Sequence, residues 1–158
     1  NYLSEHGLLD YADLETKTTE ATARYHALSD QIKAAEKRMA EIAVLRTHIV
    51  NYAKTRDTYV AYRKAGYSRK FRQEHEEEIL LHQAAKEAFN ELNVKKLPTV
   101  KELQTEYAQL LADKKAAYGE YRQTRATMRE LLTVKNNVDR LMSMEEERQE
   151  DKDHGHGR

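Results

Sequence analysis

The chain has 158 residues, with one proline and no cysteine, and its 27 basic and 27 acidic residues cancel to a formal net charge of zero at pH 7. The absence of cysteine excludes disulfides, thiolate nucleophiles and cysteine-ligated zinc, and it fits the cytoplasmic location that we expect. No apolar run reaches the roughly 18–20 residues that a membrane span needs, so we expect no membrane partner. Because the chain begins at Asn1, we expect it to be a piece of a longer polypeptide.

A first long helix is predicted over about residues 11–65, after a short lead of residues 1–10 that contains Gly7. Its apolar side chains recur at steps of three and four, which keeps one face of a helix against a partner over many turns. The helix should end near Gly66, because glycine tolerates the left-handed conformation found at helix C-termini. Ser68 is then the predicted N-cap of the next helix. The stripe consists of Leu14, Thr18, Ala21, Tyr25, Leu28, Ile32, Ala35, Met39, Ile42, Leu45, Ile49, Tyr52, Arg56 and Tyr59.

A shorter helix is predicted over about residues 69–92, with irregular apolar positions that suit packing on two partners. Pro98 has no backbone donor and disfavours helix at the residue before it. Thr99 and Glu102 then form a capping box, which predicts a third helix over about residues 99–144. The stripe of this helix consists of Val100, Leu103, Tyr107, Leu110, Lys114, Ala117, Tyr121, Thr124, Met128, Leu131, Lys135, Val138 and Met142.

Together the stripes predict an all-α fold, an elongated antiparallel coiled-coil hairpin of two long helices with a shorter third helix packed at one end. The helical domain would span residues 11–144, and residues 145–158 would form a polar, disordered tail. Pairing the two stripes from their outer ends would bring residues 56–59 close to Leu103. A parallel dimer of open helices is the alternative, and the proline turn with its capping box argues against it.

Charge is uneven along the chain although the total is zero. Eight basic residues lie between Arg46 and Arg72 against the single acid Asp57, with aromatic residues interleaved, and three lysines between residues 95 and 101 should fall at the same end of the hairpin. Cations follow phosphates and aromatic rings stack on bases, so this composition suits single-stranded nucleic acid. The alternative is an ordinary solvated face, neutralised by the acids of residues 74–78. The predicted DNA-contacting residues are Arg56, Arg63, Lys64, Tyr67, Arg69, Lys70 and Arg72.

The sequence contains no clear catalytic or metal-binding constellation. His75 and His82 lie seven residues apart, too far along one helix to chelate an ion alone, and His154 and His156 flank a glycine in the charged tail. The chain has no phosphate-binding glycine loop and no serine-hydrolase or zinc-protease motif. The tyrosines on the two stripes are expected to be packed rather than nucleophilic. We therefore expect no enzymatic activity, cofactor, metal ion or small-molecule substrate for this chain.

Three segments of the chain resemble a known family. They read HIVNYAKTRDTYVAYRKAGYSRKFR at residues 48–72, KKLPTVKELQTEY at residues 95–107 and MRELLTVKNNVDR at residues 128–140. Together they resemble the C-terminal helical region of relaxases (mobilisation nucleases) from mobile elements of gut Firmicutes. The resemblance covers most of residues 14–141. In that family an N-terminal domain nicks DNA at a transfer origin with a tyrosine and a histidine-bound metal, and none of that signature is present here.

The resemblance implies a non-catalytic helical accessory domain that contacts DNA or the transfer machinery. The alternative is a structural spacer or a dimerisation coiled coil with no nucleic-acid binding. A third hypothesis is a scaffold that binds the helix of another protein along an unfilled seam. The expected partners are therefore DNA, a protein or a second copy of this chain. On the second stripe, Lys114 and Lys135 would either specify the pairing or mark where the seam is open to solvent.

Overall fold

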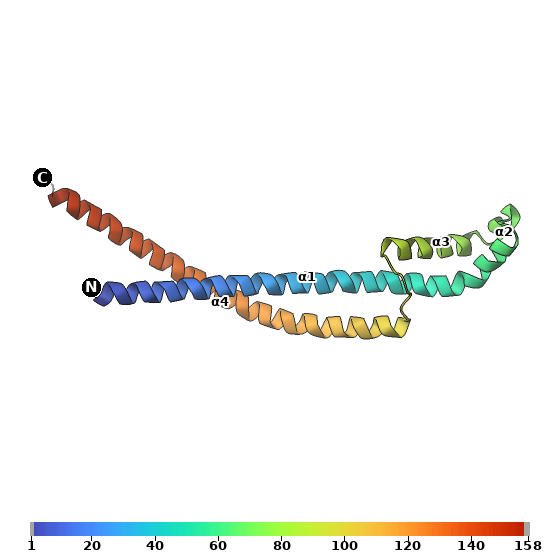
Figure 1. Ribbon diagram of the computed structural model, residues 1–158, viewed down its shortest axis with the longest axis horizontal. Coiled ribbons are helices and arrows are strands. Elements are labelled where there is room, and N and C mark those ends of the chain that lie inside the picture. Colours follow the sequence, from blue (N-terminus) through green and yellow to red (C-terminus); the bar gives the residue numbers. More distant parts are fainter. Residues whose placement is uncertain (1, 157–158) are drawn as a thin grey trace. The chain divides into compact units, whose positions relative to one another are not determined.

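The structure is a computed structural model that describes the backbone of residues 2–156 and the side chains of residues 10–153 (Figure 1). Within this part of the chain, four helices and no strands occur in the order α1 (Tyr2–Lys64), α2 (Arg69–Glu74), α3 (Glu76–Glu91) and α4 (Val100–His156). The predicted all-α class is confirmed, and the two long helices α1 and α4 pack together. The chain divides into two compact units, unit 1 (Asn1–Lys33 with Lys115–Arg158) and unit 2 (Ala34–Lys114).

Three predicted helix boundaries differ from those in the structure. Helix α1 begins at Tyr2 and α4 extends to His156, so the described parts of the predicted lead and tail are helical. Residues 145–153 are rich in Glu, Arg, Gln and Lys, which lose little side-chain freedom in a helix and therefore extend α4. The predicted helix over residues 69–92 is divided at His75, which ends α2 and precedes α3.

In unit 1, α1 and α4 meet along a narrow apolar seam. Leu28 and Ile32 of α1 are buried together with Ala117 of α4, and Tyr121 packs against them. The rings of Tyr25 and Tyr121 stack with their centroids 5.0 Å apart, and their hydroxyl oxygens lie 3.1 Å apart. Stacked tyrosines therefore extend the seam while their polar ends satisfy each other.

Polar pairs flank the seam of unit 1. The Arg24 guanidinium lies 2.7 Å from a carboxylate oxygen of Glu120. The Tyr11 hydroxyl donates a hydrogen bond to Asp139 at 2.6 Å, and Lys135 lies 3.3 Å from the same carboxylate. These two bonds lower the pKa of Asp139, with the tyrosine hydroxyl as the larger cause. Lys135 thus has a charged partner on the seam.

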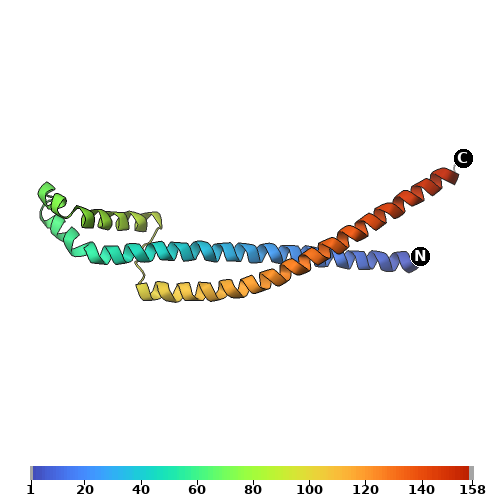
Figure 2. The same cartoon turned by 180° about the vertical axis from the view of Figure 1, so that it is seen from behind.

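Unit 2 has a three-helix core. Ile42 and Leu45 of α1, Ala85 and Phe89 of α3 and Leu103 of α4 form one buried cluster. Figures 1 and 2 both show α3 beside the C-terminal part of α1. The shorter helix predicted over residues 69–92 was expected to pack on two partners. This cluster joins its C-terminal part, α3, to both α1 and α4.

Charged contacts between α1 and α4 also specify the pairing in unit 2. The Arg38 guanidinium binds Glu106 through two hydrogen bonds, Nε to Oε1 at 2.6 Å and Nη2 to Oε2 at 3.0 Å. Such fork-to-fork pairs are directional as well as strong, and this one lowers the pKa of Glu106. Lys114 lies 3.1 Å from Glu36, so this seam lysine is also paired.

The predicted register of unit 2 is wrong at three points. Thr55, not Arg56, continues the buried face of α1, and its hydroxyl donates to the carbonyl of Asn51 at 2.6 Å. Leu103 packs on Ile42 and Leu45 rather than near residues 56–59, because α3 covers that end of α1. Tyr107, expected in the seam, is 39% exposed.

The connection from α3 to α4 is defined by its own hydrogen bonds. Asn93 has a positive φ of 55°, and the amides of Asn93 and Val94 donate to the carbonyls of Asn90 and Phe89. This pattern is a Schellman motif, in which asparagine replaces the more usual glycine. The predicted capping box is confirmed, because Thr99 N donates to Glu102 at 3.2 Å and Glu102 N donates to Thr99 Oγ1 at 3.1 Å.

The backbone conformations of two glycines, Gly66 and Gly119, can be tested by substitution with alanine. Gly119 lies inside α4 with open space where a Cβ would be, whereas Gly66 has a φ of +67°. Gly119→Ala should therefore raise the free energy of unfolding by about 0.5–1 kcal/mol, and Gly66→Ala should lower it by about 1 kcal/mol or more. Urea unfolding followed by circular dichroism measures both, and changes of the same sign would contradict the assignment.

Candidate nucleic-acid interface

The chain reverses direction between α1 and α2 through a turn centred on Gly66. The amide of Gly66 donates to the carbonyl of Arg63, and the amide of Tyr67 donates to that of Tyr62, which is the bond pattern of a Schellman motif. Gly66 occupies the left-handed position of that motif, as predicted. The rings of Tyr62 and Tyr67 meet edge to face at 5.3 Å, which supplies the apolar contact that usually accompanies this turn.

Helix α2 begins directly after the turn. Ser68 is its N-cap, as predicted, and its side chain accepts a hydrogen bond from the amide of Phe71 at 3.3 Å. The Phe71 ring stacks on Tyr62 at 6.0 Å and lies 4.4 Å from the ring of His75. The break at His75 allows Phe71 to stack on Tyr62 while Ile79 of α3 is buried. Aromatic contacts therefore fasten α2 to the end of α1.

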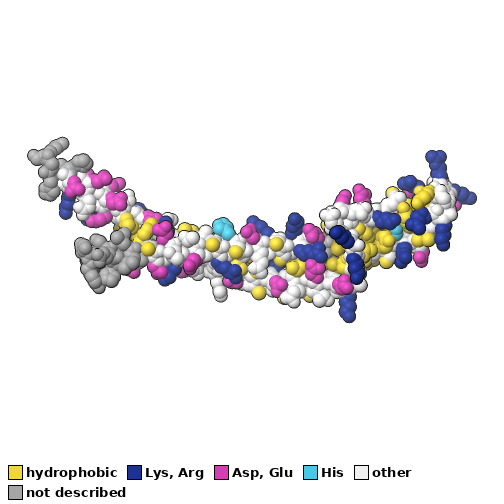
Figure 3. All heavy atoms as spheres, in the orientation of Figure 1, with side chains coloured by type: hydrophobic (Ala, Val, Ile, Leu, Met, Phe, Trp, Pro, Cys, Tyr) yellow, Lys and Arg dark blue, Asp and Glu magenta, His cyan; other side chains and the backbone are white. Residues whose placement is uncertain are grey.

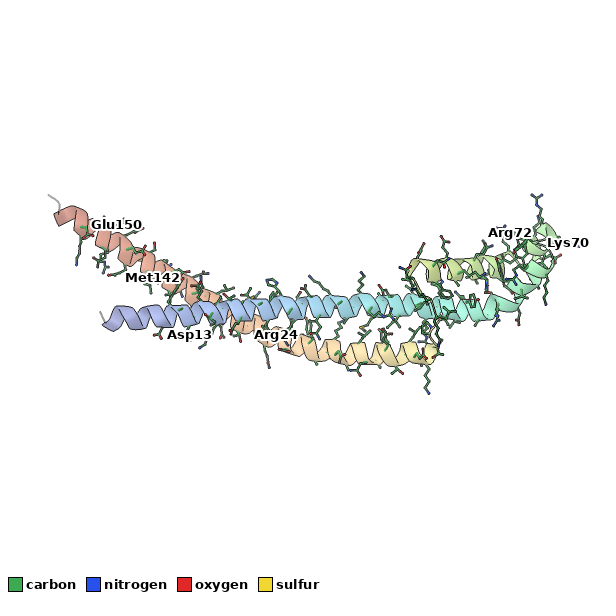
Figure 4. All side chains as sticks on the ribbon, in the orientation of Figure 1. Asp13, Arg24, Lys70, Arg72, Met142 and Glu150 are labelled. Carbon is green, nitrogen blue, oxygen red and sulfur yellow. The ribbon has the colours of Figure 1, made fainter. Side chains whose placement is uncertain are left out.

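Six of the seven predicted DNA-contacting residues gather around this turn, at the end of unit 2 where Figure 3 shows a concentration of Lys and Arg. We call these six residues the basic head, and they are Arg63, Lys64, Tyr67, Arg69, Lys70 and Arg72. All are exposed, and Figure 4 places Lys70 and Arg72 on α2. Arg56 is also exposed but lies on α1, two helical turns before Arg63.

The charge of the basic head is concentrated and accessible. Residues 63–72 contain five cations and no acid. Among the residues whose side chains are described, none of these cations takes part in an ion pair. Their positive charge is therefore available to a partner.

The acids that follow the basic head have a structural role of their own. Glu76, Glu77 and Glu78 occupy the first turn of α3, where carboxylates stabilise the positive end of the helix dipole. Thr58 donates a hydrogen bond to Glu78, which ties this turn to α1. The sequence alone suggested a neutralising block, but these acids serve α3 and form no ion pair with the basic head within the described residues.

Lys95 and Lys96 of the α3–α4 connection and Lys101 in the first turn of α4 do not join the basic head. Lys95, Lys96 and Lys101 were expected at the same end of unit 2, but the 16 residues of α3 carry the chain about 24 Å back along α1 before they occur. Figures 1 and 2 both show α2 at one end of unit 2 and the connection well along α1 from it. The expected clustering is wrong because α3 lies alongside α1 rather than across its end.

A buried histidine supports the helices that carry the basic head. His82 is 2% exposed and lies between Tyr52 and Tyr59, whose rings stack on it at 4.6 and 4.4 Å. Its Nδ1 lies 3.0 Å from the hydroxyl of Thr55. That hydroxyl also donates to the carbonyl of Asn51 at 2.6 Å, so it links the histidine to the backbone of α1.

Sequence reasoning weighed His82 only as a metal ligand and missed this stack. A signal was available, because Ile79, His82, Ala85 and Phe89 follow the three- and four-residue spacing of one helix face, and all four are buried. Tyr62, which does not belong to the predicted stripe of α1, is also buried, at 5% exposure.

Burial lowers the pKa of His82, and the nearby Lys86 ammonium lowers it further, whereas a hydrogen bond to the Tyr52 backbone opposes both effects. Lys86 itself lies 4.6 Å above the Tyr59 ring. The stack therefore favours a neutral imidazole.

Neither a metal site nor a membrane span emerges from the described residues. No group of three or more histidine or acidic side chains with metal-binding geometry occurs among them, while His154 and His156 lie outside the described side chains. None of the described helices carries a stretch long and apolar enough to cross a bilayer. Comparisons of the chain with protein-family models, curated proteins and solved structures find no match.

The His82 stack predicts a dependence of stability on pH. Because its folded pKa is lowered, the unfolded chain, with a histidine pKa of about 6.5, binds more protons, and stability falls as the pH drops through about 6.5. The variant His82→Phe keeps a ring between the two tyrosines but cannot titrate. It should lose less unfolding free energy than the parent between about pH 7.5 and 5.5, as measured by urea unfolding.

The control for this measurement is His26→Gln, which removes an exposed histidine of α1. This variant should retain the pH dependence of the parent. An unchanged pH dependence in His82→Phe would contradict the assignment of a neutral His82.

Proposed function

We propose that this chain is a non-catalytic helical accessory domain that contacts nucleic acid through the basic head, within the larger relaxase that the resemblance implies. The observation that carries the proposal is the run of five exposed cations without an acid in residues 63–72. Concentrated positive charge attracts phosphate backbones and speeds their association. Contact with the transfer machinery belongs to the same proposal, as a second use of this surface.

The rigidity of the basic head supports a binding role. Two backbone hydrogen bonds define the turn at Gly66, and Ser68 caps α2. Phe71 and Tyr62 join the two helices through stacked rings. A surface with a fixed backbone loses less conformational entropy when a ligand binds.

We further propose that α1 and α4 form an antiparallel coiled-coil hairpin. Cross-helix contacts in unit 1 support it, because Tyr11 contacts Asp139 whereas Tyr25 contacts Tyr121. The residue number on α4 falls as the number on α1 rises, which is the order expected for helices that run in opposite directions.

Charge reversal in the basic head tests the proposed function. We expect the parent chain to bind a labelled oligonucleotide of about 20 nucleotides at low salt, measured by fluorescence anisotropy. The double variant Arg69→Glu/Lys70→Glu should bind about tenfold or more weakly, because two phosphate contacts become repulsive. If five phosphates of a single strand are neutralised, log K should fall with log salt with a slope of about −3.5.

The matched control is Lys33→Glu/Lys37→Glu, which makes the same change in net charge at exposed lysines of α1 outside the basic head. This control should bind within about twofold of the parent. An equal loss of oligonucleotide affinity in both double variants would indicate a general charge effect. Undetectable binding by the parent at low salt would contradict the proposal.

A dimerisation coiled coil is the second candidate function, and one observation favours it. Near the end of α4 in unit 1, Leu141 is 62% exposed and Met144 is 55% exposed, and exposed apolar side chains at helical spacing suit a second helix. A dimer should show a mass in light scattering that rises with concentration and falls in Leu141→Glu/Met144→Glu. A mass of one chain at all concentrations would exclude it.

A further inference from the structure

Tyr67 differs from the other aromatic residues near the basic head. Tyr52 and Tyr59 stack on His82, Tyr62 is buried, and Phe71 stacks on Tyr62. Tyr67 is 57% exposed. Of the five aromatic residues that the sequence interleaves with cations, Tyr67 is therefore the one that is exposed rather than buried or half-buried.

The backbone holds this ring at the outside of the turn. Tyr67 has a φ of 59°, in the left-handed region that side chains with a Cβ rarely occupy. Asparagine is the residue other than glycine that this conformation favours, so Tyr67 holds a backbone conformation that its side chain disfavours, offset by the contact of its ring with Tyr62. Unusual backbone conformations retained by bulky residues are concentrated at binding sites.

At least one face of the Tyr67 ring is free of other rings and cations. Its only aromatic contact within the described residues is edge to face with Tyr62, and such a contact covers at most one face of either ring. Cations lie over the rings of Tyr59 and Tyr118, and no described cation lies over Tyr67. Five cations flank it in the chain, two before it and three after it.

We propose that Tyr67 is a base-stacking platform and that the basic head prefers single-stranded nucleic acid to duplex. The cations of the basic head would contact phosphates on either side of a base that stacks on the ring. Aromatic stacking requires an unpaired base with an open face, whereas the bases of a duplex are already stacked on one another. This inference rests on the proposed function, because it names the form of nucleic acid that the basic head binds.

The test compares a mixed-sequence oligonucleotide of about 15 nucleotides without internal pairing and its duplex, both bound by the full chain at low salt. The parent should bind the single strand more tightly. Tyr67→Asn keeps a residue suited to the left-handed turn and removes the ring. It should weaken single-strand binding about tenfold and duplex binding less than twofold, whereas Tyr67→Phe, which keeps the stacking face, should bind the single strand within about twofold of the parent.

The control is Tyr118→Asn, which removes an exposed tyrosine whose ring is covered by Arg122 at 4.7 Å. It should leave both affinities unchanged. Circular dichroism should show equal helix content for the parent and Tyr67→Asn, so that a loss of affinity reports the ring.

Two other results would overturn the inference in distinguishable ways. If Tyr67→Asn changes single-strand and duplex affinity equally or not at all while Arg69→Glu/Lys70→Glu weakens both, stacking is wrong and the proposed function stands. If the parent binds neither nucleic acid, both fail. Binding instead to vesicles of phosphatidylcholine with phosphatidylserine would then identify the basic head as a membrane-surface site.

Discussion

A helix of 63 residues with apolar side chains on one face gains most of its stability where other helices cover that face. In unit 1 the cover for α1 comes from α4, at Leu28 and Tyr25. In unit 2 it comes from α3 and α4 together at Ile42, and from α3 at Tyr52 and Tyr59. The need to cover this face accounts for the direction of α3, for the start of α4 beside Ile42, and for the burial of a histidine.

The turn at Gly66 separates the packed side of unit 2 from its charged surface. Tyr62 occupies the last buried position of α1. Its carbonyl accepts a hydrogen bond from the amide of Tyr67, and its ring contacts the Tyr67 ring. One side of the turn therefore belongs to the aromatic core and the other to solvent. Arg63 and Lys64 at the end of α1 and three cations of α2 surround this turn, and none of the five has an acidic partner among the described side chains. The local fold and the proposed binding surface therefore share one turn.

The aromatic stack of Tyr52, His82 and Tyr59 places a polar imidazole within the packed helices of unit 2. The imidazole lies buried between two tyrosine rings, has no oppositely charged partner among the described side chains, and has its Nδ1 3.0 Å from the Thr55 hydroxyl. Protonation of His82 destabilises this arrangement, because a charged group loses its hydration on burial. Lys86, which lies over Tyr59 on the same helix, adds to this preference.

The sequence by itself determined the all-α class, the caps and the composition of the charged surface. Gly66, Ser68 and the Thr99–Glu102 box act through bonds within a few residues, so local pattern was sufficient to predict them. Tertiary structure decided which residues share a surface, since α3 lies along α1 and removes the lysines of residues 95–101 from the basic head. It also replaced Arg56 with Thr55 in the buried face and left Tyr67 as the exposed ring of the basic head, because burial depends on which helix lies opposite each position.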